Sequence, residues 1–231
     1  MRTVGLIGGM SWESTLEYYR IINQAVSRKL GGFHSAKILL YSVDFEEIEN
    51  LMQESNWEEI GRRIGEAATT LEGAGADLLL LCTNTVHKVA DRIEQATTVP
   101  FIHIADATGE AVRSKGLRQV GLLGTRYTME LDFYKTRLIE KFGLNTLIPS
   151  EPDRIIVNDI IFNELCRGVI DEKSKAQFLR IMDGLIADGA EGIILGCTEI
   201  PLLIAPEDSP VPLFDTTLIH ALRAVEYALG E

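Results

Sequence analysis

Some features are scarce in this sequence, and their scarcity excludes several classes of protein. The 231 residues include only three cysteines. This odd number, without the spacing of metal ligands, favours reduced thiols and a cytoplasmic location. No hydrophobic run reaches the roughly 18 residues that a membrane helix needs. The segment before Met10 is too short and too weakly basic for a signal peptide.

Positive charge is also scarce. Lys and Arg number 22 against 34 Asp and Glu, which gives a net charge of −12 at pH 7. Such a field repels polyanions, so we expect neither nucleic acid nor a membrane surface as a partner. Hydrophobic residues at 46% and charged residues at 24% are ordinary globular values, which exclude disordered, collagen-like and coiled-coil chains. The length allows one large domain or two small ones.

Short aliphatic runs alternate with longer amphipathic stretches along the chain. The runs lack polar alternation, which is typical of strands buried on both faces of a parallel sheet. We expect strands at Thr3–Ile7, Lys37–Ser42, Asp77–Cys82, Pro100–Ile104, Gln119–Leu123, Asn145–Ile148, Gly192–Leu195 and Val211–Phe214. We expect helices at Ser14–Leu30, Trp57–Glu72, Val86–Ala96, Thr128–Phe142, Asp153–Gly168, Ser174–Asp188 and Thr216–Leu229. This alternation predicts an α/β protein with parallel sheets.

An internal repeat divides the chain into halves. The run Val4–Met10 (VGLIGGM) recurs as Val120–Arg126 (VGLLGTR), 116 residues later. The run Gly75–Thr85 recurs as Gly189–Glu199, 114 residues later, and a shorter third echo follows in the same order. Repeats of this length are domains that arose by duplication, not solenoid units. We therefore expect an N-terminal lobe of residues 1–104 plus 210–231 and a C-terminal lobe of residues 105–209.

The repeated motifs predict where a ligand binds, because parallel α/β units hold ligands at the carboxyl ends of their strands. The expected sites are the turn with Met10 and Ser11, the run Thr83–Thr85, Thr125, and the run Cys197–Glu199. If the two units face each other, one small cleft receives Thr83 from one side and Cys197 from the other. We expect each motif to begin a helix, whose backbone N–H groups favour an anion such as a carboxylate.

The three cysteines have different expected roles. Cys82 lies one residue before Thr83 in strand register and is expected to be an ordinary buried cysteine, as is Cys166 on a helix. Cys197 follows a strand at an expected helix N-terminus, a setting that stabilises a thiolate. A thiol whose pKa is lowered in this way serves as a base at neutral pH.

Four motifs resemble the aspartate/glutamate racemase family, and most closely its aspartate racemase branch. They are Gly5–Thr15 (GLIGGMSWEST), Cys82–Lys88 (CTNTVHK), Leu123–Thr125 (LGT) and Gly196–Glu199 (GCTE). The resemblance spans essentially the whole chain. It implies two Rossmann-like lobes related by a pseudo-twofold axis, with the active site between them. It also implies a cytoplasmic enzyme that needs no pyridoxal phosphate, metal or nucleotide, and a possible homodimer.

The resemblance assigns catalysis to two cysteines, one per lobe, which flank the Cα of the amino acid. Cys197 matches the second cysteine, whereas Thr83 stands where the first is usual. Adjacent strand residues face opposite sides, so Cys82 should not substitute for it. The resemblance therefore implies that Cys197 removes the proton of an L-amino acid. Thr83 then donates a proton on the other face, so that the reaction is biased from L to D.

Substrate binding is also carried over from the resemblance. Relatives hold the α-carboxylate with residues that match Asn84, Thr85 and Thr198, with Thr125 nearby. The distal carboxylate is often met by a polar residue on the loop after the second strand. Here the loop Glu46–Trp57 offers Gln53 as a polar group and Met52 as an apolar one. L-Aspartate or L-glutamate is therefore expected as substrate, with uncharged amino acids as the alternative.

Several candidates keep more than one interpretation. Glu199 could bind the ammonium group, tune Cys197 or simply be solvated. His103 and Asp106 could form a catalytic pair, or His103 could be structural. His87 and Lys88 could be functional or face solvent, and His220 is expected to be structural. For the whole chain, the rivals of racemisation are a single-cysteine decarboxylase or isomerase of the same superfamily and an inactive amino-acid-binding protein.

Overall fold

Two parallel sheets organise the chain, each within its own compact unit. The computed structural model describes residues 1–230. Unit 1 contains Met1–Ile104 and the segment from His220 onward, and unit 2 contains Ala105–Ile219. The expected α/β class with parallel sheets is confirmed. Residues 210–219, which the sequence analysis assigned to the N-terminal lobe, lie in unit 2 because their strand pairs with a strand of that unit.

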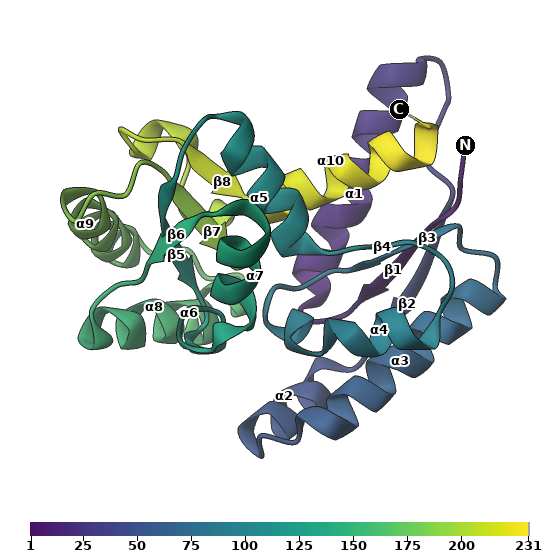
Figure 1. The fold of residues 1–231 in the computed structure, drawn as a ribbon, viewed down its shortest axis with the longest axis horizontal. Helices are drawn as coiled ribbons and strands as arrows, with labels where there is room; N and C mark the ends of the chain where they lie inside the picture. The colour runs from purple at the N-terminus through teal and green to yellow at the C-terminus, as the bar shows by residue number, and fades with distance from the viewer. Residues whose placement is uncertain (231) are drawn as a thin grey trace. The chain divides into compact units, whose positions relative to one another are not determined.

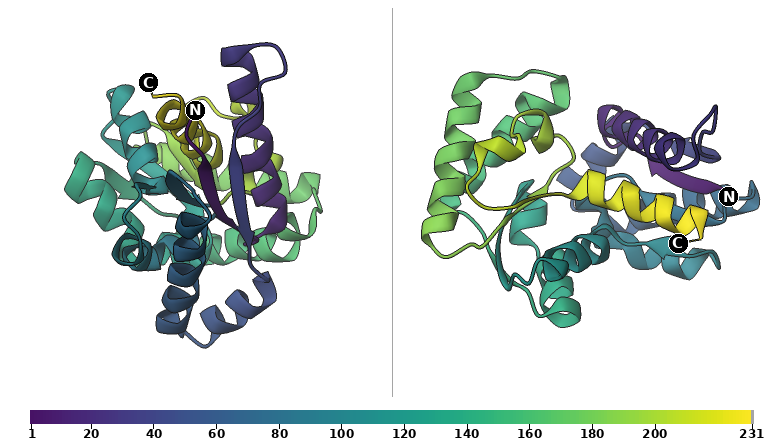
Figure 2. Two further views of the ribbon diagram at one scale, coloured as in Figure 1. Left: turned by 90° about the vertical axis from the view of Figure 1, so that its right-hand side faces the viewer. Right: turned by 90° about the horizontal axis from the view of Figure 1, so that it is seen from above.

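Unit 1 carries a four-stranded parallel sheet in the order β2-β1-β3-β4. One face of this sheet packs on helix α1 and on the part of α10 that follows His220, and these two helices lie side by side in Figure 2. Helix α3 packs on the sheet, and helices α4 and α2 pack against α3 (Figure 1). The elements are β1 (Val4–Gly8), α1 (Trp12–Leu30), β2 (Ile38–Ser42), α2 (Phe45–Gln53), α3 (Trp57–Gly73), β3 (Leu78–Leu81), η1 (Thr85–Val89), α4 (Ala90–Ala96), β4 (Phe101–Ile102) and α10 (Thr216–Leu229).

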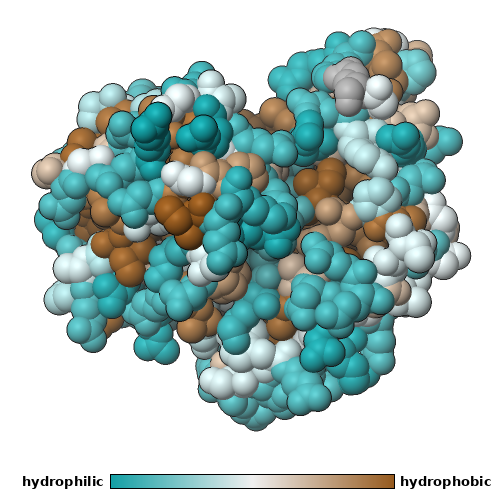
Figure 3. Space-filling model, in the orientation of Figure 1, coloured by the Kyte–Doolittle hydropathy of each residue, from teal (hydrophilic) through white to brown (hydrophobic). Residues whose placement is uncertain are grey.

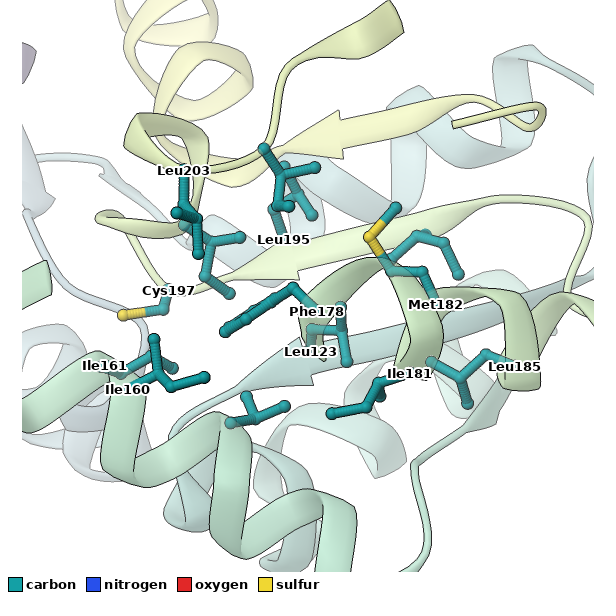
Figure 4. Packing of buried hydrophobic residues seen from close by; sticks show 14 of the residues in the cluster. Leu123, Ile160, Ile161, Phe178, Ile181, Met182, Leu185, Leu195, Cys197 and Leu203 are labelled. Carbon is teal, nitrogen blue, oxygen red and sulfur yellow. The ribbon is translucent and has the colours of Figure 1, made fainter. Parts of the chain in front are cut away.

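Unit 2 repeats this plan with the order β6-β5-β7-β8. Helices α8 and α9 bury one face of its sheet in an apolar cluster, which Figure 4 shows from close by. Helices α5 and α7 contact each other within the same unit, where Asp106 binds Arg137. The elements are α5 (Ile104–Ser114), β5 (Gln119–Gly124), α6 (Arg126–Glu130), α7 (Asp132–Phe142), β6 (Asn145–Leu147), α8 (Glu151–Asn163), η2 (Leu165–Arg167), α9 (Glu172–Ala187), β7 (Ile193–Gly196), η3 (Ile200–Leu202), η4 (Pro206–Asp208) and β8 (Leu213–Asp215).

All the expected strands form, but two helices were not expected from the sequence. Helix α2 occupies most of the expected loop Glu46–Trp57, and the Asp44 carboxylate caps it by accepting from the Glu46 amide at 3.1 Å. Helix α5 begins directly after β4, which is only two residues long. Both helices are amphipathic, over 9 residues in α2 and 11 in α5, so the pattern that predicts them was present in the sequence.

Close backbone approach at the strand ends requires glycine. A Cβ atom on Gly124 would lie 2.7 Å from the carbonyl oxygen of Gly196, its register partner on β7. Gly9 has a φ of +96°, and a Cβ there would lie 2.3 Å from the Val43 carbonyl oxygen. The two positions let β1 and β5 end in tight turns beside their neighbouring strands, which is where the repeated motifs lie.

The face drawn in Figure 3 is mostly hydrophilic, and hydrophobic residues appear on it in scattered groups. None of the helices in the described part of the chain has the length and apolar character to span a membrane.

Candidate active site

Unit 1 brings its two motif turns together at the ends of neighbouring strands. The turn after β1 holds Met10 and Ser11, each 4% exposed. Ser11 caps α1, since its side chain accepts from the Ser14 amide at 3.4 Å. The Ser14 hydroxyl donates to the Ser11 carbonyl at 3.0 Å and lies 3.4 Å from the carbonyl oxygen of Cys82, one residue before Thr83. Ser14 lies within the motif Gly5–Thr15 but was not among the predicted site residues.

The run Thr83–Thr85 is nearly closed to solvent. Its three residues are 6%, 3% and 7% exposed, in chain order. The Thr83 amide donates to the Leu81 carbonyl at 2.9 Å, which turns the chain sharply at the end of β3. A 3-10 helix follows at once, not the α-helix that we expected at this point. The motif therefore offers hydroxyl and amide groups in a buried turn.

The side chain of His87 binds the backbone of this turn. Its Nδ1 lies 2.6 Å from the Thr83 carbonyl oxygen, and its Nε2 accepts from the Ile104 amide at 3.2 Å. The side chain is only 2% exposed, which decides against the surface-facing interpretation. The next residue, Lys88, places its ammonium 4.1 Å from the ring centroid of Trp57, a cation–π contact.

In unit 2 the motif Cys197–Glu199 follows β7 in an apolar setting. Cys197 and Thr198 are each 7% exposed and Glu199 is 3% exposed. The Cys197 thiol donates to Oε2 of Glu199 at 3.0 Å, and the Thr198 hydroxyl donates to the same oxygen at 2.7 Å. Figure 4 shows Cys197 at the border of the cluster that contains Phe178. The carboxylate is thus bound by two side chains and is not a solvated group.

The expectation of a lowered thiol pKa at Cys197 is wrong for this structure. Burial raises the pKa of the Cys197 thiol well above its usual value, and the adjacent Glu199 carboxylate raises it further. The helix that was expected to stabilise a thiolate is only the single 3-10 turn η3, three residues long. A buried thiolate beside a carboxylate would be a second negative charge in an apolar region, so the thiol keeps its proton.

Thr125 lies beside the Cys197 motif, because β5 and β7 are neighbours whose last residues pair in register. Its side chain caps α6 by accepting from the Thr128 amide at 3.3 Å, and it is 6% exposed. Unit 2 thus gathers hydroxyl groups, a thiol and a carboxylate at the ends of two adjacent strands.

The other two cysteines have the structural settings that we expected. Cys82 is fully buried in the core of unit 1, and burial raises the pKa of its thiol. Cys166 is partly buried in η2 and packs against the core cluster of unit 2. Cys82 also comes directly after a strand, since β3 ends at Leu81, but its side chain packs in the core, whereas Cys166 lies on η2.

The two candidates for the distal part of the substrate lie on helix α2, not on a loop. Met52 is 3% exposed. Gln53 is exposed, and its amide donates to Oε1 of Glu49 at 2.6 Å, one turn earlier on the same helix. The amide carries a second N–H, so Gln53 can donate to a substrate carboxylate without giving up its bond to Glu49.

His103, which follows β4, does not form the catalytic pair with Asp106 that one interpretation of the sequence suggested. Asp106 instead accepts from Arg137 at 2.7 Å and from Lys141 at 2.8 Å. The ring of His103 lies 4.5 Å from the ring of His87, centroid to centroid. His220 is completely buried and binds within unit 1, so its structural interpretation is confirmed.

No group of three or more His, Cys, Asp or Glu residues is placed to hold a metal ion among the residues that the structure describes.

Known proteins resemble this chain over its whole length. The Asp/Glu/Hydantoin racemase family matches residues 7–224. A broad specificity amino-acid racemase of Bacillus subtilis is 26% identical over 177 residues, which cover 75% of this chain and 74% of that relative. A crystal structure of a Yersinia pestis protein, provisionally named an Asp/Glu racemase, is 54% identical with a TM-score of 0.93 and covers 99% of this chain and 100% of its own. An aspartate racemase homologue from Pyrococcus horikoshii is 37% identical with a TM-score of 0.85, at the same coverages.

The contact between Cys197 and Glu199 makes a testable prediction. Glu199→Gln keeps the size of the side chain but removes its charge, so the pKa of the Cys197 thiol should fall. The measurement is the rate at which iodoacetamide alkylates Cys197 as a function of pH, followed by mass spectrometry. We expect the midpoint of this profile at a lower pH in the variant. Glu172→Gln, an exposed change on α9, serves as the control and should leave the profile in place; an unchanged or higher midpoint in Glu199→Gln would contradict the prediction.

Proposed function

We propose a two-sided proton transfer at Cα for this chain, which belongs to the Asp/Glu/Hydantoin racemase family. The chain is an amino-acid racemase. In the proposed reaction Cys197 acts on the L-face of the substrate and Thr83 acts on the opposite face. The observation that carries the proposal is the bonded pair of Cys197 and Glu199 at the end of β7, because it supplies a nucleophilic sulfur with a proton acceptor 3.0 Å away.

The first half of the reaction uses this pair. The Cys197 proton moves to Glu199, which leaves a thiolate and a neutral carboxylic acid, so the buried region keeps one negative charge. The thiolate then takes the Cα proton of the L-amino acid, and the electron pair of the broken C–H bond remains on the substrate as a carbanion. The Thr198 hydroxyl, 2.7 Å from the same Glu199 oxygen, holds that carboxylate in place while the proton moves.

The second half uses Thr83. A threonine hydroxyl is far too weak an acid to ionise alone, so it must take up a proton as it gives one. The hydroxyl donates its proton to the opposite face of the carbanion and receives another from a water molecule. The proton that Cys197 took from Cα neutralises this hydroxide through solvent, and Glu199 then returns its own proton to Cys197, which restores the starting state. Cys197 can start this sequence with the L-enantiomer, whereas Thr83 is a poor base for the D-enantiomer, so the reaction is biased from L to D.

The α-carboxylate of the substrate is proposed to bind the buried polar groups of the motif turns. Asn84 and Thr85 supply them in unit 1, and Thr198 and Thr125 supply them in unit 2. These side chains are each at most 7% exposed, so hydrogen bonds to a charged carboxylate there would be shielded from water. Met10 and Ser11 line the same end of the unit 1 sheet.

L-Aspartate or L-glutamate is the proposed substrate. The support is the family match together with the Pyrococcus horikoshii relative, which is described as an aspartate racemase homologue. Gln53 is the proposed partner of the distal carboxylate. A second candidate is a broad-specificity racemase that accepts uncharged amino acids, with Met52 lining an apolar pocket. One observation favours it: Met52 is 3% exposed, whereas Gln53 faces solvent on the same helix.

The role of Cys197 as base is tested by its removal. Cys197→Ala should lower the rate at which the Cα proton of an L-amino acid exchanges with solvent deuterium by at least about a hundredfold. Exchange is followed by proton NMR in deuterium oxide. Cys166→Ala, which removes a partly buried thiol from the same unit, should retain exchange. Full exchange activity in Cys197→Ala would sink the mechanism.

The role of Thr83 is tested by a cysteine at this position, where the family usually has its first catalytic cysteine. Thr83→Cys should allow the D-enantiomer to be deprotonated, so the initial rate from D-substrate should rise relative to the L-rate by on the order of tenfold or more. A chiral chromatographic assay measures both rates. Thr70→Cys places a thiol on the exposed side of α3 and should change neither rate. If the D-rate stays undetectable while the L-rate survives, position 83 is not the second acid/base site.

The two substrate candidates are separated by Gln53→Leu. Loss of a donor to a buried carboxylate costs about 1.5–3 kcal/mol, or roughly ten- to a hundredfold in kcat/KM. We expect that loss with L-glutamate and little change with L-methionine. Gln95→Leu on α4 is the matched control. A preference for L-methionine in the unmodified enzyme, together with no effect of Gln53→Leu, would instead establish the broad-specificity alternative.

A further inference from the structure

Unit 1 buries three of the chain's four histidines in one cluster beside the Thr83 turn. His87, His103 and His220 are 2%, 4% and 0% exposed. The ring of His87 lies 4.5 Å from that of His103 and 5.9 Å from that of His220, centroid to centroid. Phe101 stacks on His87 at 5.7 Å. The proposed reaction gives none of these rings a role, although burying polar rings costs free energy unless each is bonded.

The hydrogen bonds of His87 determine which of its nitrogens carries the proton. The Ile104 amide can only donate, so Nε2, 3.2 Å away, must be the unprotonated acceptor. The proton of the neutral ring is therefore on Nδ1, which donates to the Thr83 carbonyl oxygen at 2.6 Å. The two contacts require the same tautomer, and a ring protonated on both nitrogens would oppose an N–H to the Ile104 N–H.

His220 has the opposite tautomer for the same kind of reason. Its Nε2 lies 2.7 Å from the Ile102 carbonyl oxygen, which can only accept, so the proton is on Nε2. Its Nδ1 therefore accepts from the Tyr18 hydroxyl at 2.8 Å. Burial lowers the pKa of His220 to about 4, which keeps it neutral. The segment from Ile102 to Ile104 is thus held at one end by His220 and at the other by His87.

From these contacts we infer that His87 is a positioning residue for Thr83. It fixes the Thr83 carbonyl, and with it the direction of the Thr83 side chain, relative to Ile104, the first residue of α5. The Thr83 turn has a 3-10 helix after it, which holds the backbone less firmly than an α-helix. The bond from His87 supplies the restraint that this helix does not. The inference rests on the proposed function, in which Thr83 delivers the second proton.

The consequence appears in the fate of the carbanion and not in its formation. After Cys197 has removed the Cα proton, the carbanion either regains a solvent-derived proton on the same face or receives one through Thr83 on the opposite face. The first path exchanges hydrogen with retention of configuration, and the second inverts it. Misplacement of Thr83 slows only the second path, so the ratio of inversion to exchange with retention reports its position. This ratio does not depend on how much of the enzyme is folded.

Two conservative variants separate the two bonds of His87. His87→Asn places an amide N–H near the Nδ1 position and can still donate to the Thr83 carbonyl. His87→Gln places its amide near the Nε2 position, where it can accept from Ile104 but leaves Thr83 unbound. We expect His87→Asn to retain the ratio of inversion to exchange within about twofold and His87→Gln to lower it roughly tenfold. Both products are measured with L-glutamate in deuterium oxide, by chiral chromatography with mass detection.

A third variant and a spectrum complete the test. His220→Asn disturbs the same buried cluster without touching Thr83, so it should lower the melting temperature and leave the ratio unchanged. An equal fall of the ratio in His220→Asn and His87→Gln, or an unchanged ratio in His87→Gln, overturns the inference. Long-range proton–nitrogen NMR of the full chain should show His87 protonated on Nδ1 and His220 on Nε2.

The spectrum separates failure of this inference from failure of the proposed function. If the unmodified enzyme shows no exchange at all, the proposed proton transfer fails, and the positioning role falls with it while the tautomers can still be as described. If exchange and inversion occur but His87 carries its proton on Nε2, the inference about His87 fails and the proposed function stands.

Discussion

The hydrogen bond of 3.0 Å from the Cys197 thiol to Glu199 confines one negative charge to an apolar end of unit 2. A carboxylate in such a place is stable only when donors bind it, and here the thiol and the Thr198 hydroxyl both do. The same charge raises the pKa of the thiol. In the proposed reaction the sulfur becomes reactive when its proton moves to Glu199. The proposal therefore assigns the activation of the sulfur to a neighbouring proton acceptor and not to a helix N-terminus.

Duplication has given the two units the same backbone plan but different chemistry. Each has a four-stranded parallel sheet, and each carries its motif at the ends of its two central strands. In unit 2 the motif contains its own proton acceptor, Glu199. In unit 1 the corresponding position is Thr85, and the support comes from His87, whose ring binds the Thr83 backbone. The proposed bias from L to D rests on this difference, because a threonine stands at position 85 where unit 2 has the Glu199 carboxylate.

The two halves also differ in how their motifs are anchored. Cys197 is part of a large apolar cluster with α8 and α9, so packing holds it. Thr83 lies in a turn that is held by hydrogen bonds. His87 binds the Thr83 carbonyl, and the Ser14 hydroxyl donates to the carbonyl of the preceding residue, Cys82. Hydrogen bonds are directional, whereas apolar packing is not. Thr83, the weaker acid of the proposed pair, is thus oriented by directional hydrogen bonds.

Hydrophobic patterning and the internal repeat were sufficient for the strands, the parallel sheets and the positions of both motifs, because buried strands and tight glycine turns are local features. They were not used to predict α2 or α5, although both helices are amphipathic. They also left open the roles of His87 and Glu199 and misjudged the pKa of Cys197. The tertiary structure decided those points. Proton positions and pKa values depend on which donors, charges and apolar groups surround a side chain, and contacts such as Ile104 with His87 join residues that are far apart in the chain.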